Sequence, residues 1–276
     1  MESYSVLMSV YAKVKCEELR LSIESMLNQT VFPEQFVIVY DGPLDSRIQD
    51  TISGYCSMYP NLFTIVKLET NMGLAAALNA GLDACRNELV ARMDSDDYSL
   101  PERCEYQLRE FEKDKELALL GTMTKTFVDN PENTSEFIKY RPTTEAEIKK
   151  AIRRNSPFSH PSVMYKRSIV IKCGYYDPEL RRSQDHDLFS KIINAGYVAR
   201  NIDKVLLLFR ADDSMMKRNK NKESSIARIE VQKRLLKRHE CSIFDFVYIY
   251  IMMICSIIVP VSIYKKVYKI LKSKGV

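Results

Sequence analysis

Three aspartates lie within four residues of one another in this chain, at Asp94, Asp96 and Asp97. They follow the apolar run 88–93, which predicts a short buried strand. Carboxylates this close repel one another. A divalent cation relieves the repulsion, because hard ions such as Mn²⁺ and Mg²⁺ prefer oxygen ligands. The pattern favours a metal site with Asp96 as the main ligand, Asp94 as a second ligand and Asp97 in support. The alternative is a solvated, Asp-rich turn.

A helix is expected directly after the aspartates, over residues 100–114. Ser99 could cap its start, Pro101 fits the first turn, and Glu102 is an acidic residue of the kind favoured there. Two arginines flank the aspartates, Arg92 before and Arg103 after. Each could pair with a carboxylate or a phosphate, and a purely structural ion pair is an equally good reading.

Strands alternate with helices through the first half of the chain. The expected strands are 5–10, 36–40, 63–68 and 88–93, and the expected helices are 17–28, 44–59, 73–85 and 100–114. This order predicts an α/β fold with a mostly parallel sheet covered by helices on both faces. From about residue 123 the alternation loosens: a strand at 117–122 precedes a loop at 130–133, helices at 143–155 and 185–195, and a strand at 205–209. We expect this part to complete the same domain.

Polar residues follow each of the first four expected strands: Tyr11, Asp41, Asn71 and the aspartate cluster. In an open parallel sheet, ligands bind at the carboxyl ends of the strands. Neither a Gly-x-Gly-x-x-Gly sequence nor a Walker loop is present, which argues against a dinucleotide or P-loop site. Asp41-Gly-Pro could be an ordinary turn, but its context favours a ligand-binding role.

Composition describes a folded chain with an unusual tail. The 276 residues are 46% hydrophobic and 28% charged, and the seven cysteines have neither disulfide nor zinc spacing, as in a reducing compartment. Residues 214–276 hold 14 Lys and Arg against 4 Asp and Glu, although the net charge of the whole chain is only +5. This asymmetry predicts a tail that meets an anionic surface, and nothing predicts a nucleic-acid partner.

The tail also contains an uncharged run, 246–264, interrupted by Pro260. Its length permits a transmembrane helix, but basic residues flank both ends. That symmetry favours a re-entrant or in-plane pair of helices, bent near Pro260, on the cytoplasmic leaflet. A buried core helix is the alternative. We expect a domain over 1–213, with halves 1–122 and 123–213, followed by a membrane-anchoring tail over 214–276.

Several motifs together resemble the family 2 glycosyltransferases, which are inverting, nucleotide-sugar-dependent enzymes of the GT-A (Rossmann-like) fold. The resemblance spans about residues 4–213 and is strongest to bacterial enzymes that build O-antigen or capsule repeat units. It rests on the segments 5–11, 25–30, 37–43, 71–82, 94–97, 157–165 and 183–189, in that order. No single segment would be specific, but their order and spacing are.

The resemblance implies roles for individual residues. Tyr11 and Asp41 would line the base pocket, Asn71 and Asp94 would help to bind the nucleotide sugar, and Arg210 would meet the diphosphate. His160 would contact the acceptor or the diphosphate. Gln184-Asp-His-Asp-Leu-Phe is similar to the family's Glu-Asp-x-Asp-Leu-Trp motif, which makes Asp185 the general base, with Asp187 as the rival; Gln184 and Phe189 depart from the motif.

The implied activity is metal-dependent, inverting transfer of a hexose, with Mn²⁺ or Mg²⁺ as cofactor. The donor would be a nucleotide diphosphate sugar, UDP-glucose or UDP-galactose, and the acceptor a glycan on undecaprenyl diphosphate. The expected location is the cytoplasmic face of the bacterial plasma membrane. Two alternatives remain: a sugar nucleotidyltransferase, which the absence of glycine in residues 9–15 disfavours, and a non-catalytic sugar-binding protein, which retention of both Asp185 and the aspartate cluster disfavours.

Overall fold

The first four strands lie side by side in the order β3-β2-β1-β4, and all are parallel. The computed structural model describes residues 2–211 and 222–258. Beyond β4 the sheet becomes mixed, continuing β8-β6-β9-β5, with β7 paired to β6. The strands are β1 (Tyr4–Val10), β2 (Gln35–Tyr40), β3 (Phe63–Lys67), β4 (Leu89–Asp94), β5 (Tyr98–Ser99), β6 (Leu117–Val128), β7 (Asn130–Lys139), β8 (Met164–Lys166) and β9 (Val198–Arg210).

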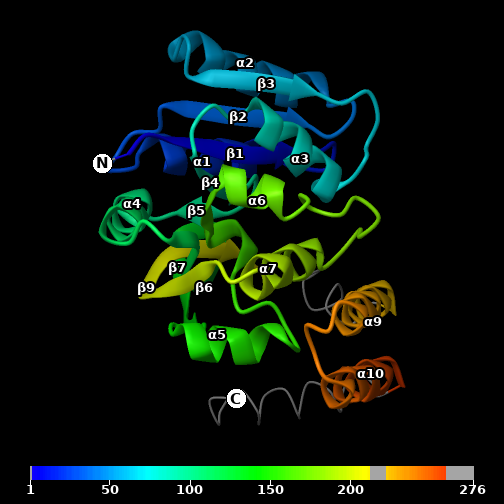
Figure 1. Ribbon diagram of the computed structural model, residues 1–276. Helices are drawn as coiled ribbons and strands as arrows, with labels where there is room; N and C mark the ends of the chain where they lie inside the picture. Colours follow the sequence, from blue (N-terminus) through cyan, green and yellow to red (C-terminus); the bar gives the residue numbers. More distant parts are fainter. Residues whose placement is uncertain (1, 212–221, 259–276) are drawn as a thin grey trace.

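Helices cover both faces of this sheet (Figure 1). They are α1 (Cys16–Leu27), α2 (Ser46–Met58), α3 (Leu74–Ala84), α4 (Arg103–Lys113), α5 (Glu145–Ile152), α6 (Arg167–Lys172), α7 (Gln184–Asn194), α9 (Lys222–Lys237) and α10 (Ile243–Ile258), with the 3₁₀ turn η1 (His160–Ser162). Met8 and its alternate neighbours on β1 pack with α1, α2 and α4, whereas Leu7 packs with α3. Because successive side chains of a strand point to opposite faces of the sheet, β1 contributes to the apolar core on each face.

The expected strands and helices of the first half are confirmed to within a few residues, and the second half does complete the same sheet. Two local predictions were wrong. Residues 130–133 belong to β7, an edge strand paired with β6, and do not form a loop. Ser99 does not cap α4: it lies in β5, its hydroxyl accepts a hydrogen bond from Gln29 Nε2, and α4 begins only at Arg103.

The first helix of the expected tail packs on the domain. Val231 and Leu235 of α9 are buried against Leu180, and Gln232 Nε2 donates to the carbonyl oxygen of Arg153. The expected boundary at 213/214 falls in the undescribed segment 212–221.

The second tail helix, α10, lies against α9 and is tied to the end of α5 by Asp245, which pairs with Arg153 and Arg154 (Figure 1). Among the described helices, none is both long and apolar enough to cross a bilayer. Pro260 and the rest of the apolar run from 259 to 264 lie outside the described residues.

Candidate active site

The strand order reverses between β1 and β4, and this is where the aspartates lie. Asp94 is the last residue of β4 and stands opposite Ser9 of β1 in the parallel register. In open α/β sheets the crevice at such a reversal is the usual ligand site. Because β1 to β4 are parallel neighbours, the predicted residues Tyr11, Asp41 and Asn71 follow strand ends on the same edge as Asp94.

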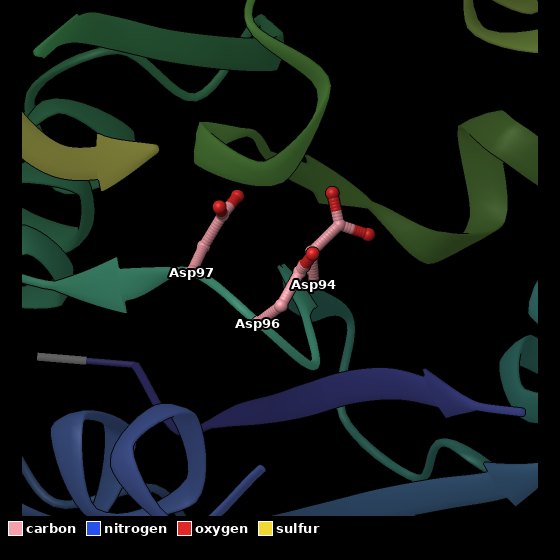
Figure 2. Close-up of side chains that lie close together, drawn as sticks. All are labelled: Asp94, Asp96 and Asp97. Atoms are coloured by element: carbon pink, nitrogen blue, oxygen red, sulfur yellow. The ribbon is translucent and has the colours of Figure 1, made fainter. Parts of the chain in front are cut away.

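The aspartates converge at the end of β4 (Figure 2), each with a ligand oxygen within 4.8 Å of the others. Asp94 is held by Arg92, a fully buried arginine whose guanidinium spans both carboxylate oxygens; Nη1 lies 2.9 Å from Oδ2. The prediction that Arg92 could pair with a carboxylate is thus confirmed. Arg103 instead donates to the carbonyl oxygens of Arg92 and Val163 and holds the backbone beneath the cluster.

Asp97 is the most enclosed member of the cluster, with 1% of its surface exposed. One carboxylate oxygen accepts a hydrogen bond from the backbone N–H of Arg210 at 2.9 Å, but the other is buried and has no partner within the described part of the chain. Arg210 also donates from Nε to the carbonyl oxygen of Asp96 at 2.8 Å. A buried carboxylate oxygen without a donor is costly, and a cation would satisfy it. The donor set therefore fits a hard divalent ion.

The carboxyl groups of Asp96 and Asp97 both resist ionisation. Burial, followed by repulsion from Asp94 and Glu18, raises the pKa of Asp96 to about 6. Burial, followed by repulsion from Asp94 and Asp96, raises the pKa of Asp97 well above its ordinary value. Glu18, from α1, was missed by the sequence analysis because nothing in its local pattern separates it from a solvated helix residue.

Asp41 organises the loop that precedes α3. Its carboxylate accepts hydrogen bonds from the backbone N–H groups of Met72 (2.7 Å) and Gly73 (3.1 Å) and from the side chain of Asn71 (3.1 Å). Gly42 is needed here because its φ is +88° and a Cβ would stand 2.6 Å from the backbone N of Asn71. Asp41 and Asn71 are thus brought together, and contact with a base remains a prediction for both.

The two candidate bases lie in different surroundings at the start of α7. Asp185 is half-buried, and its carboxylate accepts no hydrogen bond from the described residues. Asp187 is buried and pairs with Lys191 at 2.8 Å and with Arg238, directly after α9, at 2.8 Å. Its pKa is lowered, because these two cations outweigh its burial. Asp187 is therefore engaged in two structural ion pairs, and the role of Asp185 as the base stays a prediction.

His160 lies between the aspartate cluster and α7. Its Nε2 is 2.9 Å from the hydroxyl of Tyr176, and its ring meets Phe189 edge-on. Burial, and then repulsion from Arg92, lowers the pKa of His160 well below its usual range, so the imidazole is neutral at pH 7. Burial raises the pKa of the Tyr176 hydroxyl, and the charges of Asp185 and Asp94 add to the rise. It lies 16 residues from His160, and no sequence signal marked it.

The sequence comparisons identify close relatives among bacterial glycosyltransferases. A model of glycosyl transferase family 2 matches residues 5–174. The chain is 36% identical over 234 residues to the amylovoran biosynthesis glycosyltransferase AmsE of Erwinia amylovora, covering 85% of both chains. It is 32% identical over 268 residues to the UDP-Gal:alpha-D-GlcNAc-diphosphoundecaprenol beta-1,3-galactosyltransferase of Escherichia coli, covering 96% of both.

The fold is shared with solved structures. The mannosyltransferase PcManGT from Pyrobaculum calidifontis, in complex with GDP-Man and Mn²⁺, superposes with a TM-score of 0.63 at 14% identity, covering 84% of this chain and 64% of that one. At this identity the likeness concerns the fold alone, and it confirms the GT-A fold that the motifs predicted.

Proposed function

We propose that this chain, which belongs to glycosyl transferase family 2, transfers a hexose from a UDP-sugar to a lipid-diphosphate-linked sugar during surface polysaccharide synthesis. The observation that carries the proposal is the presence of two distinct acidic centres, one at the end of β4 and one at the start of α7. The aspartate cluster holds a buried oxygen without a donor, and the Asp185 carboxylate accepts no hydrogen bond from the described residues. His160 and Tyr176 lie between the two.

A divalent cation, Mn²⁺ or Mg²⁺, would be held by Asp96 and Asp94, with Asp97 close enough to join them. When bound, the ion would offset the negative charge of the donor diphosphate. Asp94 is already oriented by Arg92, and Arg210 holds the main chain of the turn through Asp96 and Asp97. The protein thus supplies a preorganised set of oxygens.

Asp185 acts as the general base. It accepts the proton of the acceptor hydroxyl while that oxygen forms a bond to the anomeric carbon of the donor sugar. The bond from the same carbon to the diphosphate oxygen breaks, and the electron pair leaves with the nucleoside diphosphate. One displacement of this kind inverts the anomeric configuration. Because a general base needs an unoccupied acceptor within reach of the hydroxyl, Asp185 suits the role and Asp187 does not.

The remaining predicted residues bind the donor. Tyr11, exposed beyond β1, stacks on the base. Asp41 shapes the adjoining loop through its bonds to residues 71–73, so that Asn71 borders the same pocket. Arg210 lies beside Asp96 and supplies positive charge near the diphosphate. Neutral His160 offers a hydrogen bond without adding charge.

The substrate classes follow from a relative's name. The Escherichia coli galactosyltransferase, similar over 96% of this chain, is named for UDP-Gal and for a diphosphoundecaprenol-linked GlcNAc. UDP-galactose is therefore the first donor to test and UDP-glucose the second. A GlcNAc-diphosphate lipid is the first acceptor.

Location at an anionic membrane surface is supported by α10. Its exposed face is a continuous apolar stripe at helical spacing without a charged residue, made of Phe244 (80% exposed), Val247, Tyr248, Ile251 and Met252. Exposed apolar stripes of this kind lie in the headgroup region of membranes. The five lysines that follow in the sequence, between 265 and 274, favour anionic lipids. The protein would then meet its lipid-linked acceptor at the cytoplasmic face of the plasma membrane.

The membrane proposal is tested by sedimentation with vesicles of phosphatidylglycerol and phosphatidylethanolamine. The double variant Phe244→Ser, Ile251→Ser should lose most vesicle binding. The matched control Phe32→Ser, Met58→Ser removes two exposed apolar side chains far from α10 and should bind as wild type does. Equal binding by all three proteins would contradict a role for α10.

The catalytic proposal is tested by UDP release from UDP-galactose, with and without the GlcNAc-diphosphate lipid and with and without EDTA. Release that requires both acceptor and metal supports the proposal. Pyrophosphate formation from UTP and a sugar phosphate would indicate a nucleotidyltransferase. Sugar binding without any turnover would indicate a non-catalytic protein.

A further inference from the structure

The segment between α6 and α7, residues 174–183, leads directly to the base and is tied to the donor side of the site. Three contacts join this connecting segment to α3 and the loop before it: Tyr175 Oη donates to Asp83 at 2.6 Å, the main chain of Tyr176 exchanges two hydrogen bonds with the Asn79 side chain, and Arg181 Nη1 donates to the carbonyl oxygen of Met72 at 3.0 Å. The segment therefore runs along α3 and ends beside the Asp41-bound loop.

The other side of the connecting segment rests on α9. Arg234 bridges two of its carboxylates, pairing with Asp177 and, at 2.9 Å, with Glu179. Directly after Glu179, Leu180 is buried in a small apolar cluster with Val231 and Leu235. The segment is thus sandwiched between the helix that borders the donor pocket and a helix from the C-terminal part of the chain (Figure 1).

A second arginine, directly after the end of α9, reaches past the connecting segment to α7. Arg238 Nη1 lies 2.8 Å from Asp187 Oδ1, and its Nε and Nη2 bind the carboxylate of Glu240. Glu240 in turn accepts a hydrogen bond from Ser190 of α7 at 2.8 Å. Asp187 lies two residues after Asp185, so this contact fixes the first turn of the helix that carries the base.

We propose that Arg234 and Arg238 are positioning residues for the catalytic base. Arg234 lies in the last turn of α9 and Arg238 directly follows it, with its backbone N–H bonded to the carbonyl oxygen of Arg234. The two arginines hold the chain on both sides of Asp185: Arg234 before it and Arg238 after it. The inference rests on the proposed function, because it takes Asp185 as the base. It adds that α9, which lies beyond the family match at 5–174, is part of the catalytic apparatus.

The contacts that hold α9 in place differ from the contacts that position Asp185. The apolar contacts of Val231 and Leu235 with Leu180 do not involve the arginine head groups, so α9 keeps its buried face when either head group is removed. The donor pocket is built by other elements, the ends of β1, β2 and β4. Loss of the Arg234 or Arg238 contacts should therefore let Asp185 shift while nucleotide binding persists. A displacement of about 1 Å at a catalytic group can cost roughly 100-fold in rate.

The test uses the full chain and the variants Arg234→Gln and Arg238→Gln, with Lys237→Gln as the matched control. Lys237 is the exposed last residue of α9, so the control also removes one positive charge but leaves the contacts of Arg234 and Arg238 intact. Turnover is measured with UDP-galactose and the GlcNAc-diphosphate lipid, and nucleotide affinity by calorimetry with UDP and Mn²⁺. We expect kcat to fall roughly 10- to 100-fold in each arginine variant, with UDP affinity within about twofold of wild type.

The conservative variant Arg238→Lys, which can still pair with Asp187, should recover part of the lost kcat. If Arg238→Gln does not fold, Arg234→Gln carries the test, because Arg234 and its two partners on the connecting segment lie partly in solvent. Wild-type kcat in the arginine variants, an equal loss in Lys237→Gln, or a parallel loss of UDP affinity would overturn the proposal. Asp185→Asn, assayed in parallel, separates the two claims: if it stays active, the assignment of the base has failed, whatever the arginine variants do.

Discussion

Replacing Asp96 with asparagine should stabilise the metal-free protein while abolishing its response to metal. Asp96 shares a crowded, largely buried site with Asp94, Asp97 and Glu18. Folding brings these charges together, and asparagine keeps the shape of the side chain without its charge. Because the pKa of Asp96 is higher in the folded state than in the unfolded chain, its contribution favours folding at low pH and is lost as the pH rises through about 6.

The magnitude follows from that pKa. A rise from 3.8 to about 6 corresponds to about 3 kcal/mol at neutral pH, at about 1.4 kcal/mol per pKa unit. Asp96 is only partly enclosed, and solvent screening reduces the figure to roughly 1–3 kcal/mol. For a domain of this size each kcal/mol shifts Tm by roughly 2–4 °C. We therefore expect Asp96→Asn to melt roughly 2–12 °C above wild type at pH 7.5 in EDTA.

The assay is thermal melting at pH 7.5 and pH 4.5, with EDTA and with Mn²⁺ plus UDP. The advantage of the variant should shrink at pH 4.5, where the wild-type carboxyl is protonated. Mn²⁺ plus UDP should raise the Tm of wild type at pH 7.5 and leave Asp96→Asn nearly unchanged. Asp50→Asn, at an exposed position on α2, serves as the control and should follow wild type. A metal-free variant that is less stable than wild type at pH 7.5 would refute the argument from crowded charge.

Asp187→Asn should mainly reduce stability, by roughly 1–3 kcal/mol in chemical denaturation, because it removes the buried carboxylate charge that pairs with the half-buried Lys191 and Arg238; unchanged stability would contradict the structural role of Asp187. Gly73→Ala should weaken UDP–Mn²⁺ binding in calorimetry, since φ is +92° and the new Cβ would lie 2.6 Å from Arg181 Nη1. The control Gly174→Ala has a similar φ of +88° but open space around it, so it should share the loss of stability and keep UDP affinity; equal binding by both variants would contradict the role of the Gly73 loop.

Much of the fold could be predicted because the first half of the chain is locally consistent. Each of the strands β1 to β4 is a short apolar run, and helical periodicity follows each one. Parallel neighbours place their carboxyl ends on one edge, so the predicted grouping of Asp41, Asn71 and Asp94 followed from topology. By contrast, β7 begins with Asn130-Pro-Glu-Asn, which is typical of a turn, and its strand conformation depends on pairing with β6.

The site was predictable where it lies in one segment and not where it is assembled from several. The aspartate cluster is a local motif, and so is Asp185. The pairing of His160 with Tyr176 and that of Asp187 with Arg238 join residues 16 and 51 positions apart. Such contacts depend on how helices pack, which periodicity does not encode. For the same reason the sequence treated residues 214–276 as a tail, whereas α9 packs against α7 and the segment that leads to the base.

The most direct test of the catalytic account is Asp185→Asn, assayed for sugar transfer and for UDP–Mn²⁺ binding in the same preparation. The substitution removes the proton acceptor and keeps the shape, and the donor ligands lie on other elements. Transfer should fall roughly 10²- to 10⁴-fold, the usual contribution of a positioned general base, with nucleotide affinity unchanged and the product of wild type opposite to the donor in anomeric configuration. Near-wild-type transfer by Asp185→Asn, or retention of configuration, would contradict the single-displacement mechanism.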